Sequence, residues 1–142
     1  LRRAADYCEG LCRGHRNQIT VECHPAHIPL RVNTDEIFQV LLNLITNANR
    51  QMQGGIITLS AEQDEQSGQT VFRVADSGRG IPTDLLAHVF ERGVSGSGGT
   101  GLGLAICKEI VREHGGGMEI ESGVSGTTVR FTVPREEGGN RA

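Results

Sequence analysis

The stretch TDEIFQVLLNLITNANRQM, residues 34–52, decides the fold because its apolar side chains recur every three or four positions. This period predicts an amphipathic helix with one buried stripe. Asn33 and Glu36 have the spacing of a capping box at its start, and Gly54 and Gly55 end it. The buried stripe consists of Ile37, Val40, Leu41, Leu44, Ile45, Ala48 and Met52.

Three polar side chains lie along the flank of this helix. At about 100° per residue, Asn43, Asn47 and Arg50 project together beside the apolar stripe. Amide oxygens are hard ligands that suit Mg²⁺, and an arginine one turn further on can meet a phosphate. The trio therefore has the chemistry to hold a metal and a triphosphate, although the helix by itself favours three ordinary half-exposed residues.

Composition and turn residues place the other elements on either side of this helix. The expected helices span residues 1–14, 84–89 and 100–114, and the expected strands span 19–23, 30–32, 56–61, 69–75, 118–122 and 127–133. This order predicts an α+β fold, a two-layer α/β sandwich in which about three helices cover one face of a mixed, mostly antiparallel sheet. The 142 residues have the size of one domain, expected over 1–134, with a polar tail over 135–142.

The segment DSGRGIP, residues 76–82, follows directly on the strand that ends at Ala75. A carboxylate only accepts hydrogen bonds, so Asp76 at this strand end suits an exocyclic amine such as that of adenine. Gly78 and Gly80 remove side chains beside it and let the backbone pack against a flat ring. A tight turn without a ligand explains the same residues equally well.

A glycine-rich stretch, GSGGTGLGL at residues 96–104, runs directly into the helix expected over 100–114. Several amides without bulky side chains meet the positive N-terminus of a helix there, which suits a phosphate. The stretch matches neither the dinucleotide fingerprint nor the lysine-containing phosphate loop. A flexible linker is the alternative, but the glycines stand at a defined helix start because apolar periodicity continues from Leu102.

Composition argues against several classes of function. Charged residues make up 22% of the chain, the formal net charge is −3 and Lys108 is the only lysine, so no basic surface for nucleic acid is expected. No apolar run has the length of a membrane span, and the start without Met indicates a piece of a longer protein. The four cysteines lack the paired short spacing of a zinc site and are interpreted as reduced thiols. They are Cys8, Cys12, Cys23 and Cys107.

Together, the three motifs resemble a known family. An asparagine-bearing helix, then Asp-x-Gly-x-Gly, then Gly-Thr-Gly-Leu-Gly-Leu, in this order, is similar to the ATPase superfamily shared by gyrase, heat-shock chaperones, mismatch-repair ATPases and histidine kinases. Residues 43–48, NLITNA, and 100–106, TGLGLAI, look like the N and G2 boxes of sensor histidine kinases. The resemblance extends from the first helix to Pro134 and implies the Bergerat ATP-binding fold.

The resemblance also implies roles for single residues. Asn47 would coordinate Mg²⁺, Asn43 would support the phosphates and the metal's water shell, and Asp76 would bind the adenine amino group. Asn43 and Arg50 are the candidates for a catalytic role. The remaining residues of the implied ATP site are Gly78, Gly80, Ile81, Phe90, Thr100, Gly101, Leu102, Gly103, Leu104 and Thr127.

Two departures from the family pattern concern the phosphates. Arg50 stands where the family often has lysine, and the two cations differ in hydrogen-bond geometry. The segment between Pro82 and Gly99, which resembles the lid over the nucleotide, is short and has Arg92 as its one cation. These departures put the usual basic contact from the lid to the γ-phosphate in question.

The reaction that the resemblance implies is phosphoryl transfer rather than hydrolysis. Gyrase-like relatives carry a glutamate as general base where this chain has Asn43, and an amide cannot take a proton from water. The expected partners are a histidine on a separate dimerisation domain of the same parent protein and a response regulator downstream, with ATP and Mg²⁺ as cofactors. The acceptor is expected outside this chain because none of its histidines has the His-Glu/Asp context of a phosphorylated histidine. All five are interpreted as surface or packing residues: His15, His24, His27, His88 and His114.

Two other functions stay open at this point. One is a conformational ATPase of the gyrase or mismatch-repair type, and the other is an interaction module that has lost its nucleotide. Asn47, Asp76 and the glycine-rich stretches argue against the second, because a decayed site loses such residues. The expected location is cytoplasmic, with no direct membrane contact from this domain even where the parent protein is membrane-anchored.

Overall fold

The computed structural model describes residues 2–14, 16–24, 34–50, 52–64, 66–78 and 102–134. In chain order its elements are α1 (Arg2–Gly14), β1 (Gln18–His24), α2 (Thr34–Arg50), β2 (Ile56–Asp64), β3 (Gln69–Asp76), α4 (Leu102–Glu113), β4 (Met118–Gly123) and β5 (Gly126–Pro134). These elements confirm the expected helices and strands that fall in the described ranges, with ends that differ by a few residues. The remaining expected features, the strand at 30–32, the cap at Asn33, the helix at 84–89 and the tail at 135–142, lie outside the described residues.

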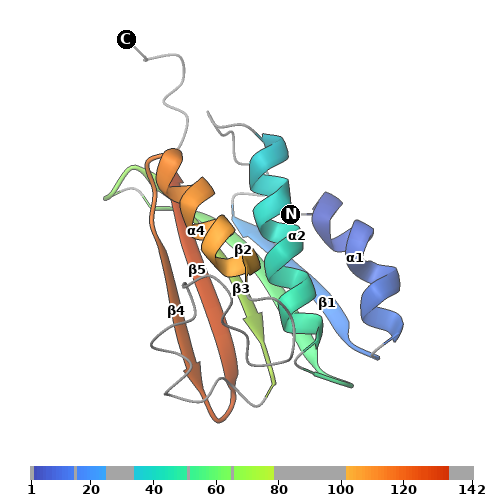
Figure 1. The fold of residues 1–142 in the computed structure, drawn as a ribbon. Helices are drawn as coiled ribbons and strands as arrows, with labels where there is room; N and C mark the ends of the chain where they lie inside the picture. Colours follow the sequence, from blue (N-terminus) through green and yellow to red (C-terminus); the bar gives the residue numbers. More distant parts are fainter. Residues whose placement is uncertain are drawn as a thin grey trace.

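The five described strands form one sheet in the order β1-β2-β3-β5-β4. β1 pairs in parallel with β2, whereas the β2–β3, β3–β5 and β4–β5 pairs are antiparallel. α1, α2 and α4 lie on one face of this sheet, with α2 between the other two (Figure 1). The predicted two-layer α+β sandwich with a mixed, mostly antiparallel sheet is therefore confirmed.

The hydrophobic core lies between the helices and the sheet. All seven residues of the stripe predicted on α2 are buried. They share one apolar cluster with inward-facing side chains of the sheet, among them Ile57 and Leu59 on β2. On the neighbouring strands β3 and β5, the rings of Phe72 and Phe131 stack with centroids 4.8 Å apart. Removal of this apolar surface from water holds the helices on the sheet.

The C-terminus of α1 is closed by a Schellman cap that places the next residue in the core. The Arg16 N–H donates to the Arg13 carbonyl at 2.9 Å, and the Asn17 N–H donates to the Cys12 carbonyl at 2.8 Å. Arg16 takes the left-handed conformation that this cap needs, with φ of 61°. α4 ends in the same way at Gly115, whose φ is 85°. The cap on α1 turns the chain so that Asn17 is buried beneath the helices.

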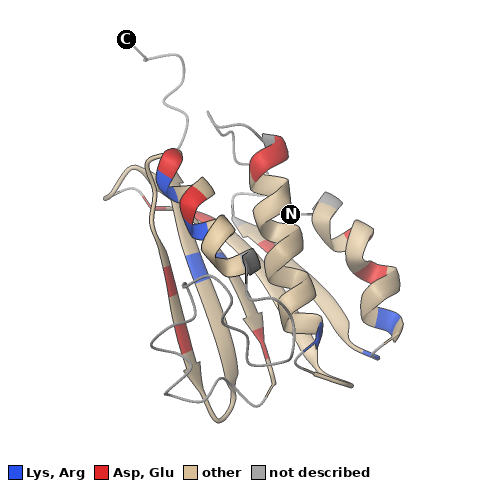
Figure 2. Cartoon of the chain, viewed as in Figure 1, with Lys and Arg blue, Asp and Glu red and all other residues tan. Residues whose placement is uncertain are grey.

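Charged side chains of both signs are interspersed over the helices and strands (Figure 2). Arg73 pairs with Glu62 at 2.6 Å and Arg130 pairs with Glu119 at 2.9 Å, so charges on neighbouring strands are matched. The prediction of reduced thiols is consistent with the structure, in which none of the four cysteines forms a disulfide. Among the helices described, none combines the length and the apolar character needed to cross a bilayer.

Candidate functional site

Three elements that carry predicted site residues converge at one end of the sheet. The C-terminal part of α2, the N-terminal end of α4 and the C-terminal end of β3 lie toward that end (Figure 1). Ser77, directly after β3, donates from Oγ to the sulfur of Met52, two residues after α2, at 3.6 Å. The same Oγ accepts a hydrogen bond from the Ile56 N–H at 3.0 Å, which fixes the end of β3 to the start of β2.

Asp76 is the last residue of β3, and backbone amides hold its carboxylate. Its Oδ1 accepts hydrogen bonds from the Gly78 N–H at 2.9 Å and from the Thr127 N–H at 3.2 Å. Among the described residues both donors use Oδ1, which leaves Oδ2 for a donor from outside. Burial raises the pKa of Asp76, and the hydrogen bonds from Gly78 and Thr127 act in the opposite direction. Asp76 is thus a fixed, half-buried acceptor.

Gly126 lets β5 approach Asp76, and sequence reasoning did not single it out. Its φ is 137°, and a Cβ at this position would lie 2.0 Å from the Asp76 carbonyl oxygen. A residue with a side chain therefore cannot stand here unless the backbone moves. The next residue, Thr127, is buried, and its Oγ1 lies 2.8 Å from the Ser122 Oγ. The glycine directly before a predicted site threonine was the available signal.

Asn43 faces α4 through a contact that the sequence did not predict. Its Nδ2 donates to the Cys107 sulfur at 3.6 Å, and that sulfur lies 3.8 Å from the Val40 carbonyl oxygen, to which the thiol donates. Cys107 is fully buried, and burial raises its pKa to about 11, against a lowering contribution from the hydrogen bond of Asn43. The thiol is therefore protonated at neutral pH. Its spacing in the apolar stripe of α4, four residues before Val111, was the signal for burial.

Asn47 and Arg50, the other two members of the predicted trio, contact each other directly. Arg50 Nη2 donates to Asn47 Oδ1 at 2.5 Å. In this structure the Asn47 oxygen therefore accepts from a cationic side chain. Within the described part of the chain no three His, Cys, Asp or Glu side chains gather as a metal site. The donor set that fits a divalent ion here is an amide oxygen completed by ligand oxygens and water.

Asn49 lies on the same helix but belongs to a different contact network. Its Oδ1 accepts a hydrogen bond from Asn17 Nδ2 at 2.7 Å, and its Nδ2 donates to the Leu11 carbonyl at 3.2 Å. Asn17 and Asn49 are both buried, and together they are named the asparagine pair below. Position 49 follows Ile45 by four residues, so its place on the buried stripe was readable from the sequence.

The structure describes only part of the remaining predicted site. Leu102 and Gly103 begin α4, and Leu104 is partly buried against the core. The rest of the predicted phosphate stretch and the predicted lid do not fall in the described ranges. The predicted residues outside these ranges are Gly80, Ile81, Phe90, Thr100 and Gly101.

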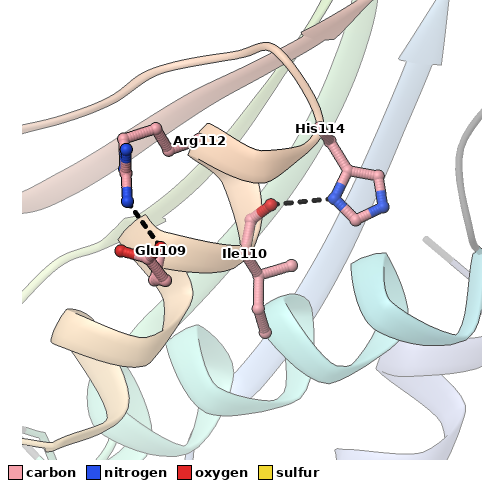
Figure 3. Close-up of polar contacts among 4 residues, drawn as sticks. All are labelled: Glu109, Ile110, Arg112 and His114. Atoms are coloured by element: carbon pink, nitrogen blue, oxygen red, sulfur yellow. Dashed lines mark hydrogen bonds and ion pairs between the residues drawn. The ribbon is translucent and has the colours of Figure 1, made fainter.

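His114 joins the end of α4 to the start of α2. Its Nδ1 lies 2.8 Å from the Ile110 carbonyl oxygen (Figure 3), and its Nε2 lies 3.2 Å from Glu36 Oε1. One turn earlier on α4, Arg112 pairs with Glu109 at 2.5 Å (Figure 3). The His114 side chain is 13% exposed and packs between two helices. These contacts agree with the packing role predicted for it.

Comparisons with known proteins match most of this chain. The family model described as "Histidine kinase-, DNA gyrase B-, and HSP90-like ATPase" matches residues 32–137. The sensor histidine kinase WalK of Bacillus subtilis (strain 168) is 39% identical over 117 residues, which are 76% of this chain and 19% of WalK. The chain therefore corresponds to a small part of the length of this curated relative.

Solved structures of similar fold include histidine kinases. The nucleotide-free catalytic domain of histidine kinase ThkA has a TM-score of 0.84 at 28% identity, covering 94% of this chain and 89% of that domain. Full-length ShkA in complex with AMPPNP has a TM-score of 0.86 at 27% identity, covering 96% of this chain and 29% of ShkA. ThkA in complex with response regulator protein TrrA has a TM-score of 0.77 at 27% identity, covering 95% and 39%.

Proposed function

Because the chain belongs to the family of histidine kinase-, DNA gyrase B- and HSP90-like ATPases, we propose that it binds Mg-ATP and presents the γ-phosphate to a histidine outside the chain. Over most of its length it is a catalytic domain of the sensor histidine kinase kind. The observation that carries the proposal is the carboxylate of Asp76, fixed through one oxygen at the end of the sheet where α2 ends and α4 begins.

Asp76 is suited to bind the adenine amino group. Gly78 and Thr127 satisfy Oδ1 through backbone amides, so Oδ2 is the oxygen that receives an N–H from the ligand. The backbone holds this acceptor before the ligand arrives, which lowers the ordering cost of binding. The complex of ShkA with AMPPNP, an adenine nucleotide analogue, supports the choice of ligand.

Asn43, Asn47 and Arg50 are suited to the phosphate end of the ligand. Asn47 Oδ1 would hold Mg²⁺, and the Arg50 guanidinium that it now accepts from would be released toward the phosphate oxygens. When bound, the metal neutralises charge that develops on the transferred phosphoryl group. Asn43 would then accept hydrogen bonds from the water around the metal. None of these side chains can remove a proton from water at neutral pH, which favours transfer over hydrolysis.

The acceptor and the further partners follow from this reaction. A histidine on a dimerisation domain of the same parent protein would take the phosphoryl group, and a response regulator would receive it next. The complex of ThkA with response regulator protein TrrA supports the second partner. We place the domain in the cytoplasm, where ATP and such a regulator are available.

Calorimetric titration of the purified chain with AMPPNP and Mg²⁺ tests the proposal. We expect saturable binding that depends on Mg²⁺, and a loss of about 100-fold in Asp76→Asn, because a charged acceptor is exchanged for a neutral one. Asp64→Asn is the matched control, since Asp64 is the last residue of β2 and pairs with Gln69, at the other end of β3. A folded chain without measurable binding would overturn the proposal in favour of an interaction module.

The reaction itself is tested by supplying the missing acceptor. With [γ-³²P]ATP and an added histidine-bearing dimerisation domain, label is expected on that domain in an acid-labile, alkali-stable form. Without the added domain, phosphate release is expected to stay near the uncatalysed background. A substantial rate of phosphate release by the chain alone would instead support the conformational ATPase.

A further inference from the structure

The Cys107 thiol contacts two groups of α2 from the facing helix α4. Its sulfur lies 3.6 Å from Asn43 Nδ2 and 3.8 Å from the Val40 carbonyl oxygen. Cys107 is 0% exposed, so water does not reach its sulfur. Asn43, by contrast, is only partly buried and stands at the edge of the core. The half-exposed side chain of Asn43 thus packs against the fully buried thiol of Cys107.

The chemistry of the three groups fixes which way the Asn43 amide faces. The Val40 carbonyl can only accept, and in this structure the thiol directs its single hydrogen to it. The sulfur then has only lone pairs to offer to Asn43, and these need a donor. The NH₂ end of the amide must therefore face Cys107, and the carbonyl end, Oδ1, is the end left for a ligand.

We propose that Cys107 is a positioning residue for Asn43, which it holds with Oδ1 available to the nucleotide's metal-bound water. This inference rests on the proposed function, because that function gives Asn43 its role as an acceptor. A flipped amide would present two N–H donors to water that itself donates, and the hydrogen bond would be lost. The orientation of one amide, set from the neighbouring helix, would thus affect the affinity for Mg-ATP.

Two substitutions separate positioning from packing. Cys107→Val keeps a similar volume but removes both the acceptor and the donor, so Asn43 Nδ2 loses its partner. Cys107→Ser retains a hydroxyl that can accept from Asn43 and donate to Val40. The matched control is Cys12→Val, because Cys12 is also buried, at 1% exposure, but lies on α1.

The experiment measures the affinity for Mg-AMPPNP by calorimetry and the side-chain amide resonances of Asn43 by NMR. We expect Cys107→Val to weaken binding about fivefold, the effect of one neutral hydrogen bond, and to shift the Asn43 amide resonances. Cys107→Ser is expected to recover most of both. Cys12→Val is expected to leave affinity and these resonances unchanged even if it lowers the thermal midpoint.

A double-mutant cycle makes the inference falsifiable. In an Asn43→Ala background, Cys107→Val is expected to cause no further loss of affinity. An equal loss in both backgrounds, or unaltered Asn43 resonances in Cys107→Val, would overturn the positioning role. The resonances are read in nucleotide-free protein, so they distinguish the two failures. If the parent chain binds no nucleotide, the proposed function fails, whereas a shift reversed by serine would still establish the hold of Cys107 on Asn43.

Discussion

The asparagine pair and Asp76 are both buried or half-buried polar groups held by hydrogen bonds, but they differ in how those bonds are used. In the asparagine pair, Asn17 Nδ2 donates to Asn49 Oδ1 at 2.7 Å, and Asn17 Oδ1 accepts from the Gly55 N–H at 2.8 Å. Both ends of the Asn17 amide are thus bonded inside the protein. At Asp76 the described donors converge on Oδ1. A buried polar group whose donors and acceptors are all bonded within the protein indicates a structural role. A group that keeps an acceptor without a partner in the protein indicates a ligand site.

The asparagine pair joins segments that are far apart in the sequence. Asn17 follows α1, Asn49 lies in the last turn of α2, and Gly55 precedes β2. Asn17 Nδ2 also lies 3.3 Å from the carbonyl oxygens of Asn49, in the last turn of α2, and of Met52, two residues beyond it. A helix end in the core leaves carbonyl groups without partners, and this side chain supplies the donor. The pair therefore holds α1 and the last turn of α2 together.

The largest effect that the comparison predicts is on stability at the asparagine pair. Asn17→Ala removes the donor to Asn49 Oδ1 and the acceptor for the Gly55 N–H, and should lower the free energy of unfolding by about 3 kcal/mol. Urea denaturation measures this loss. Gln18→Ala, at an exposed neighbouring position, should change it little.

The same variant should bind nucleotide normally in the fraction that is folded. An affinity for Mg-AMPPNP within about twofold of the parent, measured well below the unfolding midpoint, would show that the asparagine pair has no part in ligand binding, unlike Asp76. A large loss of affinity together with intact folding would show that the asparagine pair belongs to the ligand site.

Gly126→Ala should have the next largest effect, and it should lower both the stability of the fold and the affinity for nucleotide. The added Cβ meets the Asp76 carbonyl oxygen, so β5 must withdraw and the hydrogen bond from Thr127 to Asp76 is weakened. We expect a loss of about 2 kcal/mol in the free energy of unfolding and about tenfold in affinity. Gly123→Ala is the matched control in the same hairpin, because a Cβ there meets nothing within 4 Å. Equal effects of the two substitutions would contradict the close approach as the cause.

The sequence predicted the architecture because its signals were local and periodic. The stripe on α2, the glycine stops and the alternating strands are each readable from a few neighbouring residues. The sheet order and the parallel β1–β2 pair depend on contacts between distant segments, and no local period encodes them.

The residue types of the site could be predicted from the sequence, but the contacts that those residues make could not. Asn43, Asn47 and Asn49 are chemically alike. The spacing of Asn49 placed it on the buried stripe, but only the packed structure shows that its partner is Asn17 and that Asn43 meets Cys107. The partners come from elements separated by long stretches of chain, so a helical wheel of α2 could not supply them. Gly126 was missed for the same reason, because its close neighbour, Asp76, is on another strand.

A smaller effect is expected from Cys107 at alkaline pH. Burial raises the pKa of this thiol from 9.0 to about 11, so between these values the unfolded chain has lost a proton that the folded chain keeps. The stability that the thiol contributes is fully present below pH 9 and is lost as pH rises through about 11. Relative to Cys107→Val, the parent should lose about 1 kcal/mol between pH 8 and pH 10, measured by urea denaturation. A difference between the two proteins that does not change with pH would contradict the burial of the thiol.

The smallest stability effect is expected where the binding effect is largest, at Asp76. Burial raises the pKa of its carboxyl, so the contribution of Asp76 to stability is present below the unfolded value of 3.8 and is lost as pH rises through the folded value. At pH 7, Asp76→Asn removes a charge that is costly to bury, while its side-chain oxygen can still accept from Gly78 and Thr127. The variant should therefore be at least as stable as the parent at neutral pH, with a difference that shrinks toward pH 3. Asp64→Asn should behave in the opposite way, because a hydrogen bond from the Ser67 side chain lowers the pKa of Asp64 and its charged form is favoured in the fold. If Asp76→Asn instead destabilised the nucleotide-free protein as Asp64→Asn does, Asp76 would be a structural residue like the asparagine pair. The distinction between polar groups that are fully bonded within the protein and polar groups that keep an acceptor for a ligand would then fail in this molecule.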